Sequence, residues 1–133
     1  FYVEHFLDVE PDPVFIPGLK QPVRADYGYQ NGHYNLIDGV SFLRAGNEFD
    51  IFSKAVIEAQ LVKDFSDNNF VVVAEIPKER DDLFFRLEDR LGKVGARAYK
   101  FDQLEPLVND ISARSAYGKT IGGLACIILE MSG

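Results

Sequence analysis

The chain of 133 residues has no tryptophan, one cysteine, one methionine and two histidines. A lone cysteine, Cys126, excludes a disulfide within the chain and fits a reducing, cytoplasmic compartment. Neither His5 nor His33 has a partner at the spacing of zinc ligands, so we expect no zinc site. The apolar run at 124–129 is far shorter than the roughly 20 residues that span a bilayer, and we expect no membrane segment.

Positive charge is also scarce. Lysine and arginine number 14 against 21 acids, which gives a net charge of −7. Because binding to a phosphate backbone depends on lysine and arginine, we expect nucleic acid not to be a partner. An acidic balance serves solubility, and it also suits a basic protein partner.

The length fits one domain with one core, spanning 1–133. The first residue is Phe1 rather than methionine, so we expect a fragment of a longer chain. Prolines are dense in 8–22 and predict an extended connector there, because proline is excluded from helix interiors. Residues 112–133 are predicted to be a flexible tail or a final strand.

The stretch ADYGYQNGHYNLIDGV reads as two strands joined by Asn-Gly at 31–32, the strongest short signal for a hairpin. If these two residues form the turn, Gln30 faces His33. Counting outwards from that pair places Asp26 and Asp38 on opposite faces of the hairpin, because side chains alternate along a strand.

The rest of the chain predicts alternating helices and strands. Phe49, Phe52, Val56 and Ala59 recur at helical spacing and indicate the buried face of a first helix, with Asn47 as its N-cap. A continuous apolar run predicts an interior strand. We therefore expect an α/β fold with a mixed central sheet of about four to six strands and helices packed on it. The predicted elements after the hairpin are a helix at 47–65, a strand at 70–76, a helix at 78–95, a strand at 96–101 and a short helix at 102–111.

The predicted order is a hairpin with an acid on its first strand, followed by a helix, a strand, a helix and a strand. Over 23–101 this order resembles the core of the restriction-endonuclease-like (PD-(D/E)xK) superfamily. It is also similar to the C-terminal part of small bacterial and phage proteins of unknown function with an Asp-Tyr, Asn-Gly, Asn-Leu-Ile hairpin. The superfamily resemblance implies a metal-dependent nuclease, in which one strand carries an aspartate and its neighbour carries an acid and a lysine.

Asp26 matches the first aspartate of that pattern. Asp38 is the only acid on the second strand, and the predicted register turns it away. No lysine occurs between Lys20 and Lys54, so the pattern predicts a degenerate active site. If the site is catalytic, its Mg²⁺ or Mn²⁺ ligands are Asp26 and Asp38, completed by acids from outside the hairpin, Glu58 or Glu75.

The sequence therefore favours a non-catalytic protein-interaction or regulatory domain of a bacterial or phage protein, without a cofactor. Two alternatives are a metal-dependent nuclease and an acidic immunity or inhibitor protein that binds a basic partner. Tyrosines gather at the hairpin tip, where they indicate either cross-strand packing or a surface for a protein partner. The predicted binding residues are Tyr27, Tyr29, His33 and Tyr34.

Overall fold

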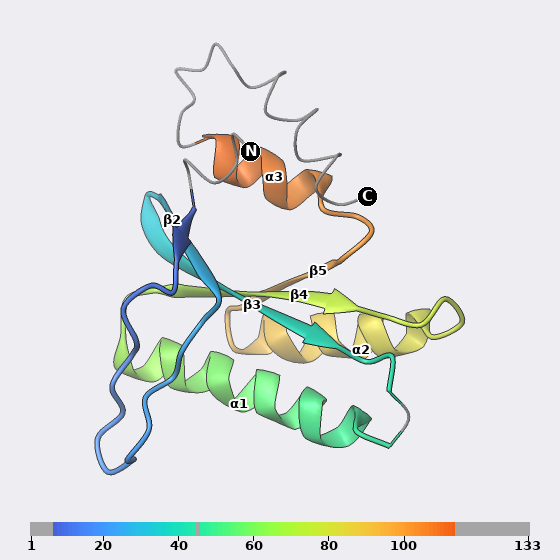
Figure 1. The fold of residues 1–133 in the computed structure, drawn as a ribbon, viewed down its shortest axis with the longest axis horizontal. Helices are drawn as coiled ribbons and strands as arrows, with labels where there is room; N and C mark the ends of the chain where they lie inside the picture. Colours follow the sequence, from blue (N-terminus) through green and yellow to red (C-terminus); the bar gives the residue numbers. More distant parts are fainter. Residues whose placement is uncertain (1–6, 45, 114–133) are drawn as a thin grey trace.

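A computed structural model describes residues 7–44 and 46–113. Its centre is a mixed five-stranded sheet in the order β1-β2-β3-β4-β5 (Figure 1). The first three strands pair antiparallel, and β3, β4 and β5 pair parallel. The predicted α/β fold with a mixed sheet is thereby confirmed. The strands are β1 (Asp8–Val9), β2 (Tyr27–Asn31), β3 (His33–Ser41), β4 (Asn69–Glu75) and β5 (Arg97–Lys100).

Helices cover both faces of the sheet. α1 (Glu48–Phe65) and α2 (Asp81–Lys93) lie on one face, and α3 (Glu105–Ala113) lies on the other (Figure 1). We call these the α1/α2 face and the α3 face. Parallel neighbours need a long crossover, which α1 and α2 provide. No helix in the described part of the chain is both long and apolar enough to cross a membrane. Most of the predicted 112–133 segment and its Cys126 lie outside the described residues.

The buried side of α1 consists of small side chains. Ala55, Ala59 and Val62 are its buried residues, so its backbone can lie close to the sheet. The prediction that Phe49 shares this face is wrong, because 79% of its side chain is exposed. At 3.6 residues per turn Phe49 lies about 80° around the helix from Ala59. Asn47 precedes the helix as predicted, but its side chain makes no capping hydrogen bond.

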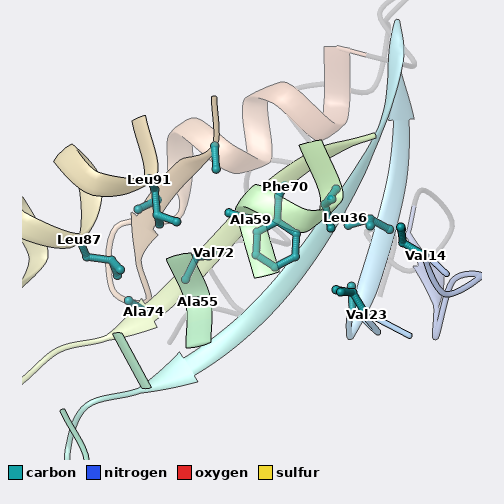
Figure 2. Close-up of a cluster of buried hydrophobic side chains, with 14 of the residues drawn as sticks. Val14, Val23, Leu36, Ala55, Ala59, Phe70, Val72, Ala74, Leu87 and Leu91 are labelled. Atoms are coloured by element: carbon teal, nitrogen blue, oxygen red, sulfur yellow. The ribbon is translucent and has the colours of Figure 1, made fainter. Parts of the chain in front are cut away.

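The larger core lies between the sheet and the two helices of the α1/α2 face. Alternate residues of the central strands, Leu36, Phe70 and Val72, point into it and meet the alanines of α1 and the leucines of α2 (Figure 2). Each fully buried leucine of this kind stabilises the fold by about 1.5–3 kcal/mol. The proline-rich connector closes one side, because Val14 and Val23 exchange backbone hydrogen bonds of 2.9 Å and are buried.

The predicted hairpin register is wrong by one residue. Asn31 pairs with His33, so Gly32 stands alone at the turn with a φ of 73°. Tyr27 consequently pairs with Ile37 rather than with Leu36. Because the side-chain period of a strand is two, this shift changes which residues of the two strands share a face.

A buried polar network joins α3 to the sheet. The Tyr29 hydroxyl donates to the Asp110 carboxylate and accepts from the Arg97 guanidinium at 3.1 Å. Arg97 also donates to the Asn35 side-chain oxygen at 3.1 Å. Burial, followed by the bond to Asp110, raises the pKa of Tyr29 above its ordinary range. Asn31 adds a bond of 3.0 Å to Asp110, so this end of α3 is fixed to the hairpin.

At the outer side of the hairpin, the aromatic ring of Tyr34 lies over Gly28. A Cβ atom at Gly28 would come within 2.3 Å of the Tyr34 hydroxyl oxygen, so the close approach requires glycine. The same hydroxyl donates to the Asp8 carboxylate at 2.7 Å. Asp8 is paired with Gly28 in the sheet, so the contact ties β1 to β2.

Candidate functional site

The observed register brings the carboxyl groups of Asp26 and Asp38 together. The ladder of β2 and β3 ends at the pair of Tyr27 with Ile37. The backbone N–H of Asp26 also donates to the Ile37 carbonyl at 3.0 Å, so Asp26 lies directly beyond the ladder. The Asp26 carboxyl raises the pKa of Asp38, chiefly through its charge and to a lesser extent through side-chain hydrogen bonding. The Asp26 carboxylate also accepts the backbone N–H of Gly39 at 3.0 Å. The register from which the sequence separates these two acids is wrong by one residue, and their carboxyls interact.

Helix α1 adds a third acid and a lysine to this pair. Leu36 of β3 points into the core of the α1/α2 face, and Asp38 shares its face because the two lie two residues apart on the strand. Glu58 and Lys54 both act on Asp38 electrostatically. They lie four residues apart on α1, so they occupy one side of the helix.

The electrostatics of the cluster favour a shared proton. The pKa of Asp38 is raised from 3.8 to about 7, first by burial and then by the charges of Asp26 and Glu58, against the opposing charge of Lys54. Burial also raises the pKa of Glu58, Lys54 opposes this effect, and Asp26 reinforces it. Two carboxyls in contact cannot both ionise freely, so near neutral pH the pair holds one proton for part of the time.

The donor set fits a hard divalent cation. Carboxylate oxygens are the ligands that Mg²⁺ prefers, and this ion is commonly held by one or two carboxylates with water at its other positions. Within the described ranges, no group of three or more Asp, Glu, His or Cys side chains stands close enough to hold a metal ion. Asp26 and Asp38 therefore offer a cation two carboxylates, and no third described side chain of these types completes the site.

The fourth acid that the sequence indicates lies elsewhere. Glu75 ends β4, pairs with Ser41 in the sheet and accepts its hydroxyl hydrogen bond at 2.8 Å. It is not among the charges that perturb Asp38 or Glu58. Electrostatic interactions thus link three of the four candidate acids, Asp26, Asp38 and Glu58.

The predicted binding residues do not form one surface. Tyr29 is fully buried in the network beneath α3, and Tyr34 lies over Gly28 on the opposite face. Tyr27 is 43% exposed on the α3 face, and His33 is exposed beside the turn. A binding role for these four residues stays a prediction, and only Tyr27 and His33 offer it a largely exposed side chain.

Lys54 is the residue that sequence reasoning missed. The resemblance places the lysine on the second strand of the hairpin, and that strand contains none. A signal was nevertheless present, because Lys54 and Glu58 lie one helical turn apart on a helix that directly follows the second strand.

Comparison with protein-family models, curated proteins and solved structures found no significant match to this chain. The resemblance to a restriction-endonuclease-like core accordingly stays a prediction. The positions of Asp26, Asp38, Glu58 and Lys54 are the basis for assigning a function.

Proposed function

We propose that the protein is a metal-dependent hydrolase of phosphodiester bonds, in which Asp26 and Asp38 hold a divalent cation. The observation that carries this proposal is the contact between these two carboxyls, with Glu58 and Lys54 beside them. The grouping agrees with the resemblance to the PD-(D/E)xK core, which requires acids and a lysine around the cation. The lone cysteine supports a cytoplasmic location in a bacterial or phage-infected cell.

Each side chain has a distinct role in this proposal. A bound Mg²⁺ or Mn²⁺ would polarise the phosphate and lower the pKa of a coordinated water. Asp26 and Asp38 provide the anchoring oxygens once their shared proton has left. Lys54 supplies positive charge toward a phosphate that gains negative charge in the transition state. Glu58, with its raised pKa, is suited to accept a proton from water.

The decisive experiment is a titration of the full chain with Mn²⁺ or Mg²⁺, followed by thermal unfolding and isothermal calorimetry. At pH 8 we expect millimolar Mn²⁺ to raise the Tm of the wild type, because a cation that binds only the folded chain stabilises it. Asp38→Asn removes one anchoring charge and should abolish the increase. Asp12→Asn, an exposed acid in the connector, is the matched control and should retain it.

Activity is measured on a fluorescently labelled oligonucleotide with and without Mn²⁺. We expect metal-dependent cleavage that Asp38→Asn removes and that Lys54→Met reduces by about 100-fold, in the range for loss of a charged transition-state contact. The proposal is refuted if Mn²⁺ does not stabilise the wild type, or if Asp38→Asn and Asp12→Asn respond alike. Cleavage that persists in Asp38→Asn also refutes it.

A non-catalytic interaction domain is the second candidate. Large aromatic side chains on the helices favour it, since Phe49 is 79% exposed on α1 and Phe85 is 60% exposed on α2. With a net charge of −7, such a domain suits a basic partner, as an immunity or inhibitor protein would. This candidate predicts that Phe49→Ser abolishes capture of one defined protein from a host extract without lowering the Tm. Equal capture by the wild type and by Phe49→Ser would exclude Phe49 as the residue that contacts the partner.

A further inference from the structure

A groove lies between α1 and α2, the two helices that cover one face of the sheet (Figure 1). Its volume is about 450 Å³, which lies within the range of pockets that bind small molecules. Its apolar lining consists of the buried Leu83, the half-buried Phe52 and Phe49, which is 79% exposed. The groove therefore offers an aromatic ring to solvent beside side chains that belong to the core.

The acids that line this groove are already paired. Among the described residues, the lining contains three arginines and two acids. Glu48 accepts a hydrogen bond from the Arg80 guanidinium at 2.9 Å. Asp89 forms an ion pair of 3.4 Å with Lys93, which lies one helical turn further along α2. Both acidic side chains thus have a positive partner, and the remaining charge of the groove is positive.

That positive charge belongs to Arg86 and Arg90, which are exposed on α2. Within the part of the chain that the structure describes, neither of them takes part in an ion pair. They lie four residues apart, so they occupy one side of the helix with about 5–6 Å between their Cβ atoms. The groove consequently presents two guanidinium groups without an ion-pair partner beside an exposed phenylalanine.

The charge of the groove is opposite to that of the whole molecule. A net charge of −7 favours a basic partner at long range. Guanidinium groups without a partner instead favour carboxylates, which they bind through two parallel hydrogen bonds. Asp50, Asp82 and Glu88 are exposed on the same two helices and would repel a phosphate backbone that extends past the groove. The groove therefore suits a short acidic peptide rather than a nucleic acid strand.

We propose that this groove binds an acidic segment of a protein partner, in which carboxylates flank one large apolar side chain. The apolar side chain lies against Phe49 and Phe52, and the carboxylates pair with Arg86 and Arg90. Phenylalanine and arginine are both enriched at protein interfaces. This inference rests on the interaction-domain candidate, for which it names the chemistry of the partner, and it does not depend on the hydrolase function.

The test selects ligands without assuming their sequence. Random twelve-residue peptides displayed on phage are selected on the immobilised full chain and, in parallel, on the double variant Arg86→Glu/Arg90→Glu. Peptides enriched on the wild type alone should be acidic and contain a large apolar residue. In anisotropy measurements with one such labelled peptide, the double variant should raise Kd by about 10-fold, because two ion pairs become like-charge contacts. Phe49→Ser should raise Kd by about 10-fold as well.

Arg24→Glu and Phe65→Ser are the matched controls, because both residues are exposed and neither lines the groove. Both controls should retain the Kd of the wild type. Basic or uncharged peptides whose binding still depends on Phe49 overturn the inference, while the interaction-domain candidate stands. If no peptide is enriched on the wild type, or if the variants and the controls bind alike, that candidate fails as well.

Other occupants of the groove are tested with the same double variant. A labelled single-stranded oligonucleotide that binds the wild type but not the double variant would assign the groove to nucleic acid. Self-association of the wild type that the double variant loses, measured by sedimentation, would assign it to a second copy of the chain. Either result overturns the inference.

Discussion

Replacing Asp38 by asparagine should stabilise the protein at alkaline pH and leave its stability nearly unchanged at acidic pH. Asparagine keeps the shape of the side chain and removes its charge. In the wild type, the folded-state pKa of Asp38 is raised from 3.8 to about 7, with burial as the first cause and Asp26 as the second. Folding therefore keeps a proton on this carboxyl that the unfolded chain releases.

The sign of the pH dependence follows from proton binding. Between pH about 4 and about 7 the folded chain binds more protons than the unfolded chain, so the free energy of unfolding falls as pH rises through this window. A pKa difference of about three, at about 1.4 kcal/mol for each pKa unit, sets an upper bound of about 4 kcal/mol. Because Asp38 retains contact with solvent, screening lowers the expected effect to about 1–2 kcal/mol.

The assay is urea denaturation of wild type, Asp38→Asn and Asp12→Asn at pH 5 and pH 8. Asp38→Asn should exceed the wild type by less than half as much at pH 5 as at pH 8, where the excess should be about 1–2 kcal/mol, or roughly 3–8 °C in Tm. Asp12→Asn should show no such pH-dependent difference. The reasoning is refuted if Asp38→Asn gains no stability over the wild type between pH 5 and pH 8. A gain in stability together with a loss of metal binding is the trade-off expected of a functional site.

Two further predictions concern the packing around the hairpin. Gly28→Ala should lower the free energy of unfolding by about 1–3 kcal/mol in urea titrations, because the new methyl group displaces the Tyr34 ring. A methyl group at Gly92 on α2 meets no atom within 4 Å, so Gly92→Ala should stabilise the helix by up to about 1 kcal/mol. Equal effects of the two substitutions would contradict this reasoning. Tyr29→Phe should cost about 1–2 kcal/mol and speed hydrogen exchange in α3, because it leaves the polar partners of the hydroxyl unsatisfied, and Tyr27→Phe should change neither.

The fold was predictable where the signal is local. The apolar run of β4 and the helical spacing of α1 and α2 identify these elements to within a few residues, because burial dictates their residue types. The hairpin was also located correctly by its Asn-Gly signal. Its register was not, because a turn with Gly32 alone and a two-residue turn differ by one residue and local sequence allows both.

The candidate site could not be predicted from the sequence, because it too depends on the hairpin register. Asp26, Asp38 and Glu58 were each recognised as candidates, but their convergence depends on the register and on which side of α1 faces β3. Lys54 comes near Asp38 only because α1 packs on the face of the sheet to which Asp38 belongs. Neither relation can be counted along the chain, since one depends on the conformation of the turn and the other on how α1 packs against β3.

The two-residue strand β1 has a consequence for how the protein behaves at high concentration. β1 is the outermost strand beyond β2, and the Tyr34–Asp8 hydrogen bond secures it. The strand that it shields, Tyr27–Asn31, reads YGYQN, which is uncharged, free of proline and rich in residues that stack in fibrils. Loss of β1 would expose its backbone groups to another molecule. Removing the Tyr34 hydroxyl, which helps to hold β1 on β2, should therefore increase the tendency of the protein to polymerise at high concentration.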